Sequence, residues 1–356
     1  MEKMPRIGGQ AVMEGVVMRN GSKMAVAVRK QDGTFTLKKY KFNKKDERPW
    51  YKKWLFIRGV VNFIDMMKMG IGCLNDSVKM AGFEEEEPGK FEKWLTEKTG
   101  KNAMDVVSAF SLVLGVGFAI ALFFILPSFI TTLTTKSIGS SVAINFIEGG
   151  IRLLIFILYI VLISQMKDIK RFFGFHGAEH KTINAFEAGE KFTVENVQKQ
   201  TTFHPRCGTS FLVLVMIIAI IVFSLTGWNG QSVLIRVAIR LVLLPVVAAL
   251  SYELLMLLAK YDNPITKILV WPGKQLQKLT TKEPDDDMVR AAIASALAVL
   301  DETWYEKAAP EGYVLPDEYV EEKNIAEEKE ADESISVNIN NIENEGETAD
   351  DGKTGD

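Results

Sequence analysis

The stretch VVSAFSLVLGVGFAIALFFILPSFITTL, residues 106–133, carries no charged side chain over its 28 positions. About 20 consecutive apolar helical residues cross the hydrocarbon core of a bilayer, so this stretch predicts a membrane-spanning helix. The pattern recurs in three further apolar runs, at residues 144–166, 211–225 and 241–259. We therefore expect a mainly α, polytopic membrane protein with about four transmembrane helices.

The distribution of lysine and arginine orients these helices. The first hundred residues and the loop at 167–206 are rich in lysine, as is the segment after the last run. The loop at 134–143 holds one lysine and the loop at 226–233 holds no charge. Because cytoplasmic loops carry an excess of positive residues, we expect both termini and the 167–206 loop in the cytoplasm. We therefore expect the chain to cross a membrane several times.

Besides Glu253 in the last run, charged residues lie inside the apolar region or near its expected outer edge at Glu148, Arg152, Arg236 and Arg240. Glu148 and Arg152 are four residues apart, so they share a helix face and can pair, which lets the 144–166 run span the bilayer. Arg236 and Arg240 lie near the expected outer face, against the positive-inside pattern. They either pair with Glu148 or extend their guanidinium groups toward the interface.

Residues 1–100 predict a small cytosolic α+β portion. Residues 24–29 and 34–40 are strand-like runs that flank an Asp32-Gly33 turn, the usual signal for a hairpin. Residues 54–74 have apolar positions at helical spacing with charges between them. This pattern predicts an amphipathic helix that lies on the protein or on the membrane surface.

The rest of the chain divides by composition. Residues 103–260 form the transmembrane region, including a cytosolic loop at 167–209, and residues 261–305 form a cytosolic helical segment. Residues 306–356 are acidic and are expected to be largely disordered. From residue 310 onward, 16 acidic residues face three lysines, a net charge of −13. The preceding residues therefore carry +10 of the chain's overall −3.

All three histidines and one of the two cysteines are clustered in the motifs HGAEH, residues 176–180, and HPRC, residues 204–207. His176 and His180 are four apart, so on a helix both imidazoles can bind one metal ion. His204 is the expected third ligand, and Cys207 is a fourth. Three protein ligands with an open position make a catalytic zinc site, whereas four make a closed structural site. We expect a divalent metal, with zinc favoured.

Glu179 lies next to the histidine pair and is the candidate catalytic residue, because a carboxylate beside a metal can take a proton from water. The order HxxEH is also the inverted zinc-peptidase pattern, in which a distant glutamate completes the site. Glu253, in the last apolar run, is available for that role. Its alternative is a hydrogen bond to Tyr252 or to another span.

A glycine-rich stretch near the start, GGQAVMEG at residues 8–15, is the second unusual feature. Closely spaced glycines let the backbone approach a ligand or another chain, and Glu14 could reach the same site. The stretch lacks the strand and helix that flank a nucleotide-binding glycine motif, so no nucleotide cofactor is expected. A tight structural turn is the favoured interpretation.

Five separated motifs, in order, resemble the YqhQ family of bacterial membrane proteins over about residues 5–300. They are GGQAVMEGVVMR (8–19), HGAEHK (176–181), HPRCGTSF (204–211), SYE (251–253) and EPDDD (283–287). The family has no established function and is often labelled as predicted metal-dependent enzymes. The resemblance implies a bacterial plasma membrane, crossed several times, as the location. It also implies a candidate site made of His176, Glu179, His180, His204 and Cys207, with Glu14 and Glu253 as outer candidates.

Two functions follow from these patterns. The first is a metal-dependent hydrolase that activates water on a peptide or lipid-linked substrate at the inner membrane surface. The alternative is a non-enzymatic scaffold or assembly factor for membrane proteins, in which the His/Cys cluster holds a structural ion or forms a polar network. The lysines before the first span lack stacking aromatics, so they favour contact with anionic lipid and no specific nucleic acid is expected.

Overall fold

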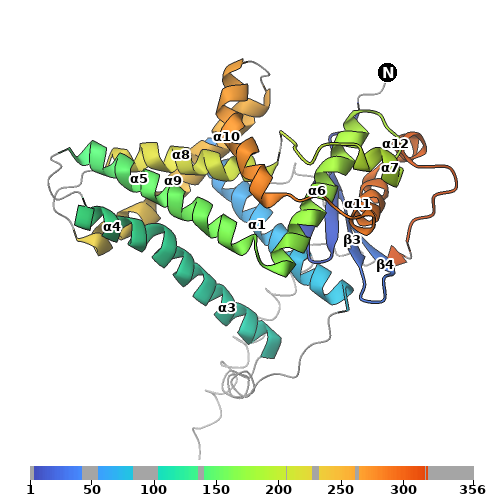
Figure 1. Ribbon diagram of the computed structural model, residues 1–356, viewed down its shortest axis with the longest axis horizontal. Coiled ribbons are helices and arrows are strands. Elements are labelled where there is room, and N and C mark those ends of the chain that lie inside the picture. Colours follow the sequence, from blue (N-terminus) through green and yellow to red (C-terminus); the bar gives the residue numbers. More distant parts are fainter. Residues whose placement is uncertain are drawn as a thin grey trace, which may run out of the picture.

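The computed structural model describes residues 4–41, 55–82, 103–134, 140–205, 207–226, 232–260, 264–316 and 318–319. These residues are mostly helical, with one small sheet near the N-terminus. Figure 1 shows long apolar helices gathered on one side of the molecule and the sheet with its covering helices on the other. The expectation of a mainly α protein with a small N-terminal α+β portion is confirmed.

The sheet is an antiparallel meander of four strands, to which a short parallel strand is added at one edge. The Asp32-Gly33 hairpin is confirmed. The two strands before it come from the glycine-rich stretch, whose turn at Met13 and Glu14 joins them. The strands are β1 (Gly8–Val12), β2 (Gly15–Asn20), β3 (Lys23–Arg29), β4 (Phe35–Lys41) and β5 (Glu318–Tyr319).

Both faces of the sheet are buried. Val16, Met18 and Ala25 belong to the core on one face, whereas Val17 and Val26 belong to the core on the other. The first face is covered by α6 (Lys167–Glu187) and α11 (Asp286–Val299), and the second is covered by α1 (Leu55–Met80). The expected amphipathic helix is therefore confirmed in α1, which packs on the sheet and also on α9.

Three distant parts of the sequence thus share one folded body. We call it the sheet unit: the sheet with α1, α6, α7 (Val194–Gln198), α11 and α12 (Glu302–Ala308). Two glycines allow its close packing. A Cβ on Gly174 would lie 2.6 Å from the sulfur of Met288, and one on Gly177 would overlap the carbonyl oxygen of Lys282. The EPDDD motif begins α11, where the Asp285 side chain accepts from the backbone N–H of Met288.

The C-terminal part remains folded beyond residue 305. Ala308 and Ala309 are buried in the core of the sheet unit, and β5 pairs in parallel with β4. The folded part therefore includes residues that composition assigned to the disordered tail, because these residues are apolar or pair with a strand edge. Residues 320–356 lie outside the described part of the chain.

Three apolar helical segments are long enough to cross a membrane: Phe110–Thr134, Ser141–Ile163 and Val233–Leu255. A fourth apolar segment, Leu212–Ser224, is shorter. The count of about four thus becomes three full-length candidates and one short helix among the described residues. The apolar bundle consists of α3 (Ala103–Ile120), the π-helix η3 (Ala121–Ile125), α4 (Leu126–Thr134), α5 (Ser141–Ile163), α8 (Gly208–Ser224) and α9 (Val233–Lys260).

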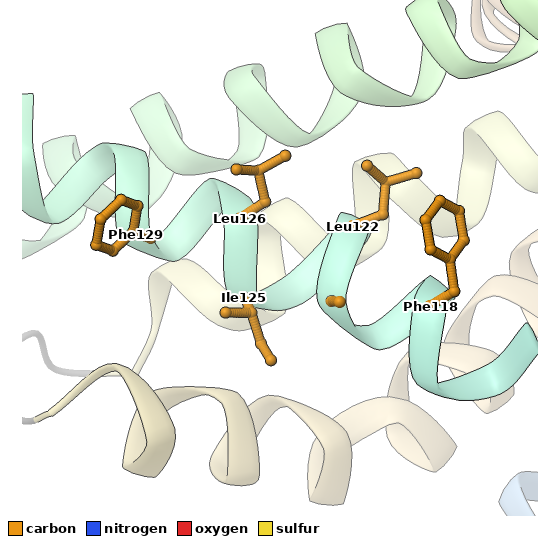
Figure 2. Close-up of a pocket in the computed structure, with 6 residues that line it drawn as sticks. Phe118, Leu122, Ile125, Leu126 and Phe129 are labelled. Atoms are coloured by element: carbon orange, nitrogen blue, oxygen red, sulfur yellow. The ribbon is translucent and has the colours of Figure 1, made fainter. Parts of the chain in front are cut away.

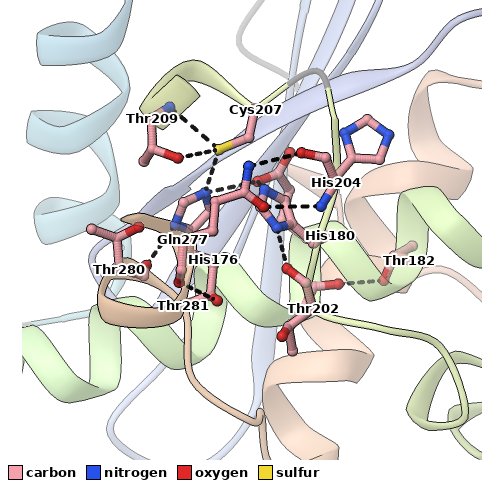
Figure 3. A network of polar contacts seen from close by, with 12 residues as sticks. His176, His180, Thr182, Thr202, His204, Cys207, Thr209, Gln277, Thr280 and Thr281 are labelled. Carbon is pink, nitrogen blue, oxygen red and sulfur yellow. Dashed lines mark hydrogen bonds and ion pairs between the residues drawn. The ribbon is translucent and has the colours of Figure 1, made fainter. Parts of the chain in front are cut away.

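The helix after α9, α10 (Pro264–Thr280), packs on α8 and leads back into the sheet unit. The N-terminal end of α8 and the C-terminal end of α10 therefore meet α6 where the apolar bundle joins the sheet unit (Figures 1 and 3). This junction contains the histidine and cysteine motifs.

Candidate metal site

The two histidines of α6 are held in one tautomer by backbone carbonyls. The Nδ1 atom of His176 lies 2.8 Å from the carbonyl oxygen of Thr280, and the Nδ1 atom of His180 lies 2.5 Å from that of Thr202 (Figure 3). A carbonyl oxygen only accepts, so each Nδ1 carries the proton and each Nε2 presents its lone pair. This is the arrangement in which histidine binds metals.

Cys207 completes a group of three ligands. Its sulfur lies 3.3 Å from Nε2 of His176, and one ligand atom from each of His176, His180 and Cys207 lies within 4.8 Å of the others. Cys207 is the N-cap of α8, where its sulfur accepts from the Thr209 backbone N–H at 3.4 Å. A tetrahedral zinc ion, with bonds of about 2.0–2.3 Å, suits donor atoms spaced in this way.

Burial sets the protonation of all three ligands. It lowers the pKa of His176 and lowers that of His180 to about 3, so both imidazoles are neutral at neutral pH. It raises the pKa of the Cys207 thiol to about 11, against the hydrogen bonds from Thr209. The Nε2 atom of His180 is buried without a hydrogen-bond partner among the described residues. Buried polar atoms are normally satisfied, so this atom is one that a cation would complete.

Glu179 lies beside this group, outside the three ligands. Its Oε2 atom is 3.8 Å from Nε2 of His176 and 3.9 Å from Nε2 of His180. The side chain is buried, and burial raises its pKa to about 8, opposed by a hydrogen bond from the backbone N–H of Gly9. The carboxyl group is thus placed to exchange a proton with a molecule at the open position of a three-ligand site.

The glycine-rich stretch enters the site through β1. A Cβ on Gly9 would lie 3.0 Å from Cγ of Glu179 and 2.8 Å from Sδ of Met18. Only glycine lets the strand approach the glutamate this closely, and this approach allows the Gly9 N–H to reach the carboxylate. The favoured interpretation of the glycines, a tight turn, holds at Met13 and Glu14, and the alternative, a close backbone approach, holds at Gly9, which approaches Glu179.

His204 lies next to the site and is anchored through its backbone. Its N–H donates to Oε1 of Gln277 at 3.1 Å, and its carbonyl accepts from Nε2 of Gln277 at 2.8 Å. Its ring centroid is 5.8 Å from that of His180, and its Nε2 is 3.6 Å from Glu187. Cys207, and not His204, is the third member of the close group. Gln277, on α10, was not identified from the sequence.

The two outer candidates have other surroundings. Glu14 lies in the β1–β2 turn with φ +54°, and its carboxylate pairs with the guanidinium of Arg171, whose Nη2 is 2.5 Å away. Glu14 therefore fastens the hairpin to α6. Glu253 is half-buried on α9, which packs chiefly on α1 and α8. Its neighbour Tyr252 accepts a hydrogen bond from Asn62 at 2.8 Å.

Residues 54–302 match a family described as protein of unknown function, DUF1385. The chain belongs to this family. A protein of Bacillus subtilis (strain 168), described as "Uncharacterized protein YqhQ", is 36% identical over 292 residues, which cover 82% of this chain and 91% of the relative. The resemblance of the five motifs to the YqhQ family is therefore confirmed. No solved structure matches the chain.

The part of the chain that matches DUF1385 contains the whole His/Cys cluster and Gln277, but it begins after β1. The strand that contacts Glu179 therefore lies outside the matched range. In this DUF1385 protein the side chains of the candidate site come from α6 and from the start of α8. The backbone groups that orient them come from β1, from the segment before α8 and from the end of α10.

Proposed function

We propose that this protein is a metal-dependent membrane hydrolase that holds zinc with His176, His180 and Cys207. The donor set supports this ion, because two neutral imidazoles and a thiolate are ligands that zinc accepts at a site with one open position. The unsatisfied Nε2 of His180 supports it as well. The convergence of these donor atoms beside a buried carboxyl group is the observation that carries the proposal.

When bound, a zinc ion with three protein ligands supplies Lewis acidity that makes a water molecule nucleophilic near neutral pH. The protein's own groups do the rest. Oε2 of Glu179 takes the proton of the attacking water and returns it to the leaving group. The Gly9 N–H holds that carboxylate in place, and the carbonyls of Thr280 and Thr202 keep the two imidazoles oriented.

The position of the site supports a substrate at the membrane surface. Cys207 begins an apolar helix of the bundle, whereas His176 and His180 belong to the sheet unit. A peptide or lipid-linked substrate that lies along the bilayer edge would reach both. The lysine-rich loops support a cytoplasmic position for this junction and for both termini.

The orientation is tested by cysteine labelling. Glu190 is exposed after α6, so Glu190→Cys offers a reactive thiol, whereas Cys73 is buried. We expect an impermeant maleimide to label Glu190→Cys only after the cells are opened. Labelling from outside intact cells would place the site on the other side of the membrane.

The metal is tested on tag-free protein in detergent by elemental analysis. We expect about one zinc per chain. Less than about a tenth of an equivalent of any transition metal would refute a resident metal site. Glu179→Gln then separates catalysis from structure, with the exposed Glu190→Gln as the matched control. We expect Glu179→Gln to keep zinc and to lose hydrolysis of fluorogenic peptides and ester lipids, while Glu190→Gln keeps both.

The second candidate is a scaffold with a closed structural zinc site. The specific observation behind it is the proximity of His204 to His180, which would allow a fourth ligand after a small shift. Under this alternative His204→Ala lowers both the zinc content and the amount of protein in the membrane. Under the hydrolase proposal His204→Ala keeps its zinc.

A further inference from the structure

One edge of the sheet is bare. Strand β1 comes first in the strand order, so among the described residues it pairs with β2 on one side and with no strand on the other. The opposite edge is protected twice, because β4 (FTLKKYK) carries three lysines and β5 pairs with it. Strand β1 (GGQAV) has neither a charged residue nor a proline. Edge strands normally carry such protection, so a bare edge beside the candidate site indicates a place where another strand can pair.

The register of the hairpin shows which backbone groups of β1 point outward. Val12 and Gly15 close the two-residue turn, so they form a hydrogen-bonded pair, and such pairs recur at every second residue. The residues between them on β1, Gly9 and Ala11, therefore point their N–H and C=O groups away from β2. The hydrogen bond from the Gly9 N–H to Glu179 agrees with this direction.

Three outward groups of β1 remain for a ligand: the C=O of Gly9 and both the N–H and the C=O of Ala11. In the part of the chain that the structure describes, these groups have no hydrogen-bond partner. The Ala11 side chain packs in the core with α6 and α11, so the strand is fixed while its backbone faces outward. The start of β1 is exposed, which gives a ligand access. Backbone groups at a strand edge bind best to the backbone of another extended chain.

We propose that the substrate is an extended peptide segment, which pairs with β1 as a further antiparallel strand. This inference rests on the proposed hydrolase function and names its substrate class. Antiparallel pairing continues the meander of the sheet. The peptide residue that faces Ala11 then donates its N–H to the Ala11 carbonyl and accepts from the Ala11 N–H.

The same register brings one peptide carbonyl to Glu179. Because the strands are antiparallel, the residue that faces Gly9 follows the residue that faces Ala11 by two positions along the peptide. Its N–H donates to the Gly9 carbonyl, and its own carbonyl lies beside the Gly9 N–H that holds the Glu179 carboxyl group. The water oxygen bonds to this carbonyl carbon, the adjacent C–N bond breaks, and the proton taken by Glu179 passes to the leaving nitrogen. The register therefore predicts which peptide bond is cut.

A hydrocarbon chain has a different place on the molecule. An apolar hollow of about 330 Å³, lined only by apolar side chains between Phe118 and Phe129, follows α3, η3 and α4 (Figure 2). Both η3 and α4 pack on α5 and α9, and in the described part of the chain none of the candidate ligands comes from these segments. The hollow therefore gives a lipid-linked substrate no position at Glu179, whereas β1 contacts Glu179 directly.

The test is an N-methyl scan of peptide binding, which removes one peptide N–H at a time. The protein is full-length Glu179→Gln in detergent, which is not expected to consume the ligand. The probe is the member of a set of fluorescein-labelled hexapeptides that binds it most tightly by fluorescence anisotropy. We expect methylation to weaken binding about tenfold at two positions that are two apart, those facing Ala11 and Gly9, because each loses one hydrogen bond. The position between them is the matched control, since its N–H points away from β1, and its methylation should leave the affinity unchanged.

A variant of the protein tests the same edge. Ala11→Pro removes an N–H that takes no part in the ladder, and proline is tolerated at such an edge position. Added to Glu179→Gln, it should weaken binding of the unmethylated peptide about tenfold and leave the zinc content as it is in Glu179→Gln. If this variant does not accumulate, the methyl scan decides alone.

The outcomes separate this inference from the hydrolase proposal. Equal effects of methylation at every position, or no binding of any peptide, would overturn the peptide assignment, and hydrolysis of ester lipids by the wild type would still support a hydrolase. An alternating scan supports the strand pairing, and the wild type should then cut the same peptide directly after the second sensitive position. An alternating scan without cleavage would leave the strand pairing supported and refute hydrolysis of the bound peptide.

Discussion

Replacing Gly9 with alanine tests the contact on which the site geometry depends. The new Cβ would overlap the carbonyl oxygen of Val17, and it would lie 2.8 Å from Sδ of Met18 and 3.0 Å from Cγ of Glu179. The methionine can move, but the carbonyl belongs to the β1–β2 ladder, in which Gly9 faces Met18. The strand must therefore move away from β2 or from Glu179, and either shift changes the hydrogen bond from the Gly9 N–H.

Two effects set the magnitude of the Gly9→Ala change. Overpacking in a core costs about 1–3 kcal/mol, and because Gly9 is exposed the lower end of this range applies. Disturbing a group that orients a metal site lowers metal affinity or activity by about 10- to 100-fold. We therefore expect the free energy of unfolding to fall by about 1 kcal/mol and activity to fall at least tenfold, with the zinc content unchanged. Because Glu179 lies beside the candidate ligands, the fold change in activity should exceed the fold change in the folding equilibrium constant.

The assay pairs Gly9→Ala with Gly8→Ala. Gly8 is exposed, and a Cβ added there meets no atom within 4 Å, so this neighbour controls for the loss of glycine flexibility. Activity is measured as hydrolysis of the fluorogenic peptides and ester lipids, and stability by thermal unfolding in detergent. If Gly9→Ala matches Gly8→Ala in both measurements, β1 does not position Glu179 and the reasoning fails.

Three further predictions rest on other contacts. Gly177→Ala should destabilise the sheet unit by about 1–3 kcal/mol in thermal unfolding, because its Cβ would overlap the carbonyl of Lys282; a stability equal to that of the wild type would contradict this close approach. Glu148→Gln should lower the free energy of unfolding by about 3–5 kcal/mol and reduce the amount of protein in the membrane, because it removes the carboxylate that Arg152 and Arg240 share. A normal amount of protein in the membrane would show that the two arginines are neutralised in another way. Zinc affinity should rise with pH. The pKa of Cys207 is raised to about 11 and that of Glu179 to about 8, so below about pH 8 both groups carry protons in the metal-free protein. Zinc binding releases both protons. The zinc affinity of the wild type should then rise about a hundredfold per pH unit, and that of Glu179→Gln about tenfold. If titration calorimetry gives the same pH dependence for both proteins, Glu179 releases no proton on zinc binding.

The sequence predicted those features that depend on local patterns. Apolar runs longer than a bilayer core identified α3–α4 and α5, and the spacing of His176 and His180 placed two imidazoles on one face of a helix. The pairing of Glu148 with Arg152 also follows from spacing alone. Each of these predictions uses residues within one helix, so the periodicity of the helix was enough to make it.

Features that depend on distant segments were not predictable in this way. Strand β1 was missed because its closely spaced glycines indicate a turn, and strand β2 because it is buried on both faces and its apolar residues do not alternate with polar ones. Cys207 is closer to the α6 histidines than His204 because Gln277, on α10, holds the backbone of His204 through two hydrogen bonds. No pattern within the 204–207 motif contains that information.

The short helix α8 joins the His/Cys cluster to the apolar bundle. Its 17 residues extend over about 26 Å, less than a bilayer core of about 30 Å. A helix this short can reach across only if polar partners meet its ends near the bilayer, and both ends have them: the Cys207 cap at the His/Cys cluster and the Thr226 carbonyl bound by Asn145. In the proposed membrane arrangement the His/Cys cluster then lies at the level where the bilayer begins, which favours a substrate that is itself embedded in the membrane over one that diffuses freely.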